Sequence, residues 1–166
     1  MILDLKSVFI SDGASLPVNF ELDMHEMVFS GVCPIKKPVS VKGSIFNRAG
    51  IVTADLLCEV EYEAPCDRCG KETIKQHSVH IERVLVSKLA DRESDDIIEI
   101  PDMQLNASEL CIDEIVLYLP MKHLCGEECK GVCAMCGKDL NEGKCGCESV
   151  SHDPRLEALA QLLNDN

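Results

Sequence analysis

The run VTADLLCEVEYE, residues 52–63, decides the fold class of this chain, because its apolar and polar residues alternate almost strictly. Six apolar residues occupy the even-numbered positions, namely Val52, Ala54, Leu56, Cys58, Val60 and Tyr62. Most odd-numbered positions are polar or acidic. Successive side chains of a strand point to opposite faces, so this run predicts a β-strand with one buried face and one face in solvent.

The flanking residues extend this strand into a meander. Residues 39–45, VSVKGSI, show the same alternation, and the following NRAG, residues 47–50, predicts a hairpin turn. On the other side, Val79 and Ile81 share one phase whereas Val84 and Val86 share the other, which predicts a β-bulge near Glu82 and Arg83. Further strands are expected around residues 2–10, 18–22, 27–32 and 97–101.

The second half of the chain predicts helices. Apolar residues of the segment 107–119 form one stripe, Asn106 or Ser108 is a candidate N-cap, and Pro120 ends the helix. Asp153 and Pro154 predict the start of a terminal helix. The expected fold is therefore α+β, an antiparallel and barrel-like sheet with one or two helices and a C-terminal zinc-knuckle segment. We expect a β domain over 1–120, a cysteine-rich knuckle over 121–148 and a helix over 149–166.

Six cysteines crowd into the stretch that follows the first helix, where large apolar side chains are scarce. Burial cannot fold such a stretch, so a crosslink must. The sequence CAMCG at 133–137 has the form of a zinc knuckle, and CGC at 145–147 supplies a second close pair. We expect one Zn²⁺ on four thiolates, with Cys133, Cys136, Cys145 and Cys147 as the leading set. The rival ligands are Cys125 and Cys129.

The chemical nature of this crosslink depends on the cellular compartment. The N-terminus has no secretory leader, and no apolar run is long enough to span a membrane. These features predict a cytoplasmic protein whose thiols stay reduced, which favours metal over disulfides. Disulfides and an iron–sulfur cluster remain open alternatives. The knuckle is expected to dock on the sheet domain through Leu117, Leu119 and Met121.

A further pair, Cys66 and Cys69, lies in the sequence CDRCG between two predicted strands. Three interpretations compete: a second zinc knuckle with ligands from elsewhere, a redox dithiol, and a structural or recognition loop that exposes Arg68. A reactive dithiol usually has a helix N-terminus to lower the pKa of its first cysteine, and the flanks here are extended. We therefore favour the loop. The remaining cysteines, Cys33, Cys58 and Cys111, are expected to pack as small buried hydrophobes.

These motifs together resemble the YceD family, the bacterial and plastid large ribosomal RNA subunit accumulation proteins. The resemblance covers roughly residues 38–160, from CDRC at 66–69 through EIVLYLPMK at 114–122 and the cysteine cluster to DPRL at 153–156. Its departures are Val132, Ala134 and Gly70, none of which is a proposed ligand. The resemblance implies a non-enzymatic role in 23S rRNA accumulation and large-subunit assembly. It also implies a ribosomal protein or pre-ribosomal RNA as partner.

Other functions remain open beside this one. A zinc-ribbon interaction module in transcription is an alternative, and a CxxC thiol oxidoreductase is a weaker one. No catalytic motif occurs in the sequence, so we expect neither catalytic residues nor a small-molecule substrate.

Charge bears on the choice of partner. The net charge of −13 opposes binding to phosphates, and aromatic residues make up only 4% of the chain, which leaves few stacking surfaces. Residues 91–120 hold nine acidic residues and a single arginine. We therefore expect this segment to dock on a cationic ribosomal protein. Weaker phosphate contacts are expected from Arg68, Lys71, Lys75, Lys130, Lys138 and Lys144.

Overall fold

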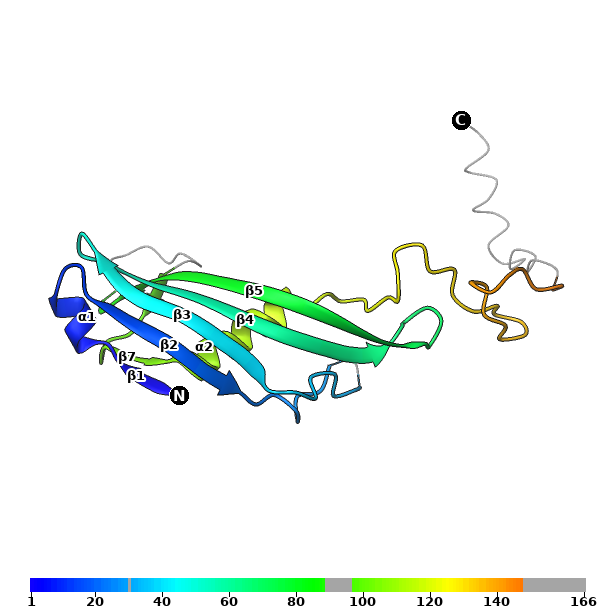
Figure 1. The fold of residues 1–166 in the computed structure, drawn as a ribbon, viewed down its shortest axis with the longest axis horizontal. Coiled ribbons are helices and arrows are strands. Elements are labelled where there is room, and N and C mark those ends of the chain that lie inside the picture. The colour runs from blue at the N-terminus through cyan, green and yellow to red at the C-terminus, as the bar shows by residue number, and fades with distance from the viewer. Residues whose placement is uncertain (30, 89–96, 148–166) are drawn as a thin grey trace, which may run out of the picture.

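The computed structural model describes residues 1–29, 31–88 and 97–147. Its main element is a five-stranded sheet with the order β2-β3-β4-β5-β6 (Figure 1). Four of its strands form an antiparallel meander: β2 (Ser15–Leu22), β3 (Val39–Arg48), β4 (Ile51–Pro65) and β5 (Glu72–Val86). The short β6 (Ile97–Glu99) pairs with β5 in the parallel direction, so the sheet is mixed at this edge.

The sheet is not a barrel. Among the described residues β2 and β6 are its two edges, and no pairing joins them. The barrel-like closure expected from the sequence is therefore wrong, and the structure has an open sheet beside a two-stranded one. That second sheet pairs β1 (Ile2–Asp4) with β7 (Gln104–Asn106).

The β4–β5 hairpin is the longest element of the fold, and its register has no bulge. Pairing continues without a break from Val52–Leu85 to Pro65–Glu72. Val79, Ile81 and Leu85 are all buried, so Arg83 occupies an inward position of the same strand. The predicted bulge is wrong. The alternation of buried and exposed side chains continues through this region, and the charged Arg83 faces inward because it is paired with Glu114.

The β3–β4 turn forms where the sequence predicts a hairpin. Ala49 and Gly50 have φ angles of 52° and 82°, the left-handed values that a tight two-residue turn requires. Asn47 is buried at 2% exposure and donates from Nδ2 to the carbonyl of Val8 at 2.8 Å. Its Oδ1 accepts a hydrogen bond from the N–H of Gly50 at 3.0 Å. The turn is thus tied to α1 (Lys6–Ile10).

The core lies between the inner face of the large sheet and a layer that includes α2 (Ala107–Tyr118). The side chain of Asn106 caps α2 by accepting from the N–H of Glu109. Arg83 of β5 forms a two-pronged ion pair with Glu114 of α2, with Nε–Oε1 and Nη2–Oε2 distances of 2.8 and 2.9 Å. This pair fastens the helix to the sheet.

Several expectations for single elements also differ from the structure. Residues 6–10 are helical, and the segment around 27–32 contributes only an isolated bridge between Phe29 and Val32. Cys58 and Cys111 are fully buried as expected, but Cys33 is exposed. The predicted helix over 149–166 lies outside the described residues. No helix in the described part of the chain is long and apolar enough to cross a membrane.

Candidate metal centre

Eight thiols of the described chain gather into two groups of four, in each of which all Sγ atoms lie within 4.8 Å of one another. The first group consists of Cys66, Cys69, Cys125 and Cys129. The second consists of Cys133, Cys136, Cys145 and Cys147. Each group can hold a metal ion. The first group lies at the tip of the β4–β5 hairpin, and the second lies in the cysteine-rich segment, whose backbone continues beyond this tip (Figure 1).

The first group joins parts of the chain that are far apart in sequence. Two thiols come from the hairpin tip and two from the segment after α2, with Sγ···Sγ distances of 3.8 Å for Cys66–Cys129 and 3.7 Å for Cys69–Cys125. Cys66 and Cys129 are buried, whereas Cys125 is exposed. The second group is local in sequence, and its members are exposed or half-buried.

The first half of each group is formed by the same kind of backbone turn. The N–H of Gly70 donates to the carbonyl of Cys66, and the N–H of Gly137 donates to that of Cys133, both at 2.8 Å. The N–H of each first cysteine donates in turn to the carbonyl of the lysine five residues later, both at 2.9 Å. Gly70 and Gly137 have φ angles of 72° and 73°, a conformation that favours glycine. Two similar knuckles therefore start the two groups.

Backbone contacts dock the cysteine-rich segment on the hairpin tip. Arg68 donates from Nη1 to the carbonyl of Cys129 at 2.8 Å, and its own carbonyl accepts from the N–H of Val132 at 3.2 Å. At Gly131 (φ 72°) a Cβ atom would lie 2.9 Å from the carbonyl oxygen of Arg68. Glycine therefore permits this close approach. The guanidinium of Arg68 thus links the two segments, while the residue remains exposed as the sequence predicts. Its role in recognition stays a prediction.

His123 anchors the start of the same segment. Its backbone N–H donates to Oδ2 of Asp67 at 2.7 Å, and its carbonyl accepts from the N–H of Asp67 at 2.8 Å. The ring is buried at 4% exposure, lies 5.0 Å from the ring of Tyr62, and bonds through Nε2 to Thr73 Oγ1 at 2.6 Å. His123 is therefore a packing residue beside the first group and not one of its members.

In each group, hydrogen bonds lower the pKa of some thiols and raise the pKa of others. Burial disfavours the thiolate of Cys66, but backbone N–H groups of Cys125 and Arg68 outweigh this and lower its pKa to about 6. Backbone N–H groups of Cys136 and Met135 lower the pKa of Cys133 to about 6. Hydrogen bonds to neighbouring thiols raise the pKa of Cys125 and that of Cys147 to about 12. A divalent cation would offset the charge of four adjacent thiolates.

The structure brings together the leading ligand set expected from the sequence, but it assigns the other cysteines differently. Cys125 and Cys129 are not rivals for a single site, because they lie with Cys66 and Cys69. The pair at the hairpin tip thus belongs to a second four-thiol group. A signal for it exists in the sequence: CDRCGK at 66–71 repeats the pattern of CAMCGK at 133–138. Leu117 and Met121, expected to dock the knuckle, are 80% and 98% exposed.

This combination of an open sheet, a long hairpin and two thiol knuckles defines a sheet protein with a cysteine-rich appendage. The family model described as "Large ribosomal RNA subunit accumulation protein YceD" matches residues 54–163. The chain belongs to the YceD family. A relative from Bacillus subtilis (strain 168), "Uncharacterized protein YlbN", is 28% identical over 131 residues, or 78% of this chain and 76% of the relative. No solved structure matches the chain.

Proposed function

We propose that this protein is a zinc-stabilised, non-enzymatic factor of the cytoplasm that supports 23S rRNA accumulation and assembly of the large ribosomal subunit. The observation that carries the proposal is the family match, whose description names large-subunit rRNA accumulation. The match begins in β4 and includes the hairpin tip and both thiol groups. Family membership therefore covers the part of the chain that holds the candidate metal centre.

Zinc is the ion that suits both groups best. A tetrahedral Zn²⁺ with Zn–S bonds of about 2.3 Å has S···S edges of about 3.8 Å. In the first group, the Sγ···Sγ distances of Cys66–Cys129 and Cys69–Cys125 are 3.8 and 3.7 Å. Both groups are made of thiols alone, the donor set of a structural zinc site. Bound zinc would crosslink a segment in which few apolar side chains are buried.

Elemental analysis of protein purified without chelators tests the metal assignment. We expect two zinc ions per chain, falling to one in Cys66→Ser. The exposed Cys33 lies outside both groups, so Cys33→Ser is the matched control and should keep both ions. A zinc content near zero, or iron in its place, would overturn the assignment.

The ratio of 23S to 16S rRNA in a deletion strain of the source organism tests the biological role. We expect this ratio to fall on deletion, and to recover with the wild-type chain or with Cys33→Ser. Rescue should fail with the double variant Cys66→Ser/Cys129→Ser, which removes half of the first thiol group. An unchanged ratio in the deletion strain would exclude the proposed role.

Thiol–disulfide exchange is a second candidate, favoured by the lowered pKa of Cys66. Against it, Cys66 lies at a hairpin tip next to three other thiols instead of at a helix N-terminus. Insulin reduction by the zinc-loaded protein separates the two candidates. We expect no turnover above the Cys66→Ser background, and catalytic turnover would favour the oxidoreductase.

A further inference from the structure

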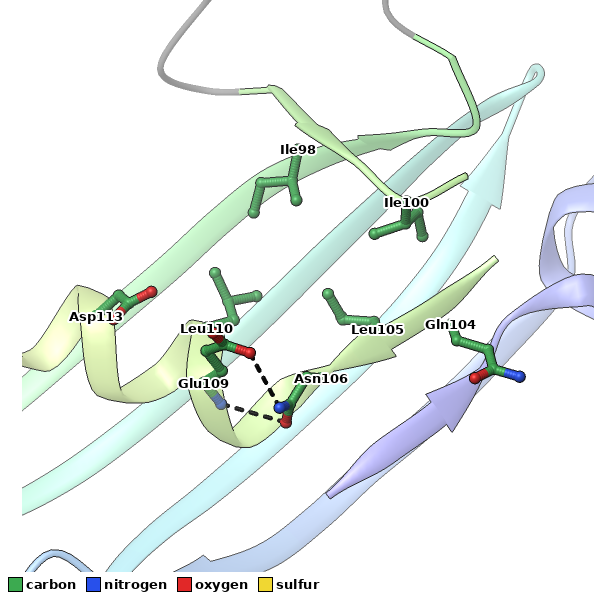
Figure 2. A pocket seen from close by; sticks show the side chains of 8 residues that line it. All are labelled: Ile98, Ile100, Gln104, Leu105, Asn106, Glu109, Leu110 and Asp113. Carbon is green, nitrogen blue, oxygen red and sulfur yellow. Dashed lines mark hydrogen bonds between the residues drawn. The ribbon is translucent and has the colours of Figure 1, made fainter. Parts of the chain in front are cut away.

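A pocket of about 320 Å³ lies at the other end of α2 from the thiol groups, between β6, β7 and the first turns of the helix. Figure 2 shows four aliphatic side chains directed toward one another across it. Three of them are buried at 8% exposure or less, and the fourth is partly buried; they are Ile98, Ile100, Leu105 and Leu110. The pocket therefore has an apolar floor.

The rim of this pocket is polar and acidic. It is made by the amides of Gln104 and Asn106 and the carboxylates of Glu109 and Asp113. Asn106 orients Glu109, because its Nδ2 donates to Oε2 of the carboxylate at 3.0 Å (Figure 2). Asp113 follows one helical turn later, on the same side of α2. Two carboxylates thus border one opening.

These carboxylates lack cationic partners in the part of the chain that the structure describes. No described Lys, Arg or His forms an ion pair with Glu109 or Asp113, whereas the adjacent Glu114 is paired with Arg83. Residues 97–118 contain five acidic residues and no lysine, arginine or histidine. The charged side chains among the described residues that line the pocket, Glu109 and Asp113, are therefore both negative.

We propose that this pocket binds an arginine or lysine side chain from a cationic segment of a partner protein. The aliphatic stem of such a side chain lies against the apolar floor, and its charged head meets Glu109 and Asp113. The charge of the rim selects this occupant, because phosphates of an RNA would be repelled there. The inference rests on the proposed function, since the cationic proteins of a ribosomal subunit supply segments of this kind.

An NMR titration of the ¹⁵N-labelled, zinc-loaded full chain locates the site. The probe is n-butylguanidinium, which has the stem and head of arginine, and n-butyrate is the control with the opposite charge. We expect n-butylguanidinium to shift the amide signals of Leu105, Glu109 and Asp113, and butyrate to leave them in place. Equal shifts with both probes, or shifts only outside the pocket, would overturn the proposal.

Affinity for a labelled peptide of sequence Gly-Leu-Arg-Lys-Arg-Leu-Gly then tests the two carboxylates. Glu109→Gln/Asp113→Asn should raise the peptide Kd by about tenfold, and Gln replaces Glu109 without loss of a helix former. The matched control Glu21→Gln/Glu82→Gln removes two exposed carboxylates on the large sheet and should stay within about twofold. Equal losses of peptide affinity in both double variants would mean that only the net charge of the protein matters, and would overturn the proposed pocket site.

Two further measurements complete the test. Gln104→Trp narrows the opening without changing the charge and should also weaken peptide binding, and unchanged binding would contradict insertion. Shifts of the Leu105, Glu109 and Asp113 amide signals on addition of a 20-nucleotide oligouridine without peptide would show that RNA occupies the surface and would overturn the proposal. Peptide binding is measured on purified protein, so its failure leaves the rRNA phenotype intact, and a missing phenotype leaves the peptide result intact.

Discussion

Asn141 links the segment after the second knuckle to the first thiol group. Its Oδ1 accepts from the N–H of Lys130 at 2.8 Å, and its Nδ2 donates to Sγ of Cys129 at 3.5 Å. A donor aimed at sulfur stabilises the thiolate form and helps to lower the pKa of Cys129, to which the N–H of Gly131 contributes most among the lowering contacts. Residues that orient metal ligands in this way tune the affinity of a site.

Asn141→Asp is therefore expected to weaken metal binding at the first group by about 10–100-fold, because it replaces the donor to sulfur with a second negative charge. Competition with a fluorescent zinc chelator measures the change. Asn19→Asp makes the same substitution on the exposed side of β2 and should leave both affinities unchanged. Equal effects of the two substitutions would contradict the role of Asn141.

His77 predicts a dependence of stability on pH. Burial lowers its pKa below the ordinary value of 6.5, with Lys75 as a further cause. Its ring packs edge-on against Tyr62 and Tyr118, at centroid distances of 6.1 and 6.2 Å. The unfolded chain then binds a proton more readily than the folded one. The contribution of neutral His77 is complete above pH 6.5, and it is lost as the pH falls below 6.5 and through the lower pKa of the folded state.

The unfolding free energy should consequently fall less steeply between pH 7.5 and 5.5 in His77→Gln than in the wild type. Urea titrations of both proteins at constant zinc concentration measure this difference. Because the two proteins share their thiol groups, any release of metal by acid affects both alike. Parallel pH profiles would show that His77 does not titrate differently in the folded state.

The spacing of the cysteines predicts the knuckle turns better than it predicts which other cysteines complete each four-thiol group. Cys133, Cys136, Cys145 and Cys147 are close in sequence, so local geometry suffices to bring them together. The partners of Cys66 depend on where the chain runs after α2, which is set by tertiary contacts such as those of Asp67 with His123. No local pattern encodes such an approach, and only the repeated CxxCGK sequence hints at it.

At the scale of elements, the alternation of apolar and polar residues predicts strands well. It predicts poorly whether the sheet that these strands form closes into a barrel. The meander of β3, β4 and β5 follows from period two and a turn signal, and α2 from its cap and apolar stripe. Whether a sheet closes depends on which edges meet, and here β1 pairs with β7 instead of with an edge of the large sheet. The parallel pairing of β6 with β5 is likewise decided by the path of the chain and not by residue type.

An ion pair between Arg83 and Glu114 joins β5 to α2, in addition to the contact of His77 with Tyr118. The side chains of Arg83 and Glu114 are only 24% and 17% exposed, so loss of either partner leaves a poorly solvated charge. Glu114→Ala should lower the unfolding free energy by about 2–3 kcal/mol. A double-mutant cycle with Arg83→Ala isolates the pair, and a coupling energy near zero would contradict its structural role.

At the scale of the whole molecule, the two thiol groups differ in protection. The first contains two buried cysteines and spans the hairpin and the segment after α2, whereas the second is local and more exposed. Access to the sulfur atoms governs how easily a chelator removes the ion. We expect EDTA to remove zinc in two phases, a fast one from the second group and a slow one from the first.

Variants that each lack one cysteine show which group gives rise to which phase. Cys136→Ser should abolish the fast phase and keep the slow one, and Cys66→Ser should do the opposite. A single phase in the wild type, or loss of the same phase in both variants, would show that the two groups release metal as one unit.

The first thiol group also connects the cysteine-rich segment to the rest of the fold, beside the hydrogen bonds of Arg68 and Asp67. The large sheet has a core of its own in which neither group takes part, so we expect its stability to be independent of metal. Residues 121–147 bury little apolar surface and rely on the hairpin tip and the thiol crosslinks.

Hydrogen exchange of Cys66→Ser should therefore show faster exchange over the hairpin tip and residues 121–132, with β3 and the middle of β4 unchanged. Cys136→Ser should loosen only 133–147, because the crosslink to the hairpin is still present. Faster exchange of the whole sheet in Cys66→Ser would mean that the metal stabilises the entire molecule and not its appendage alone.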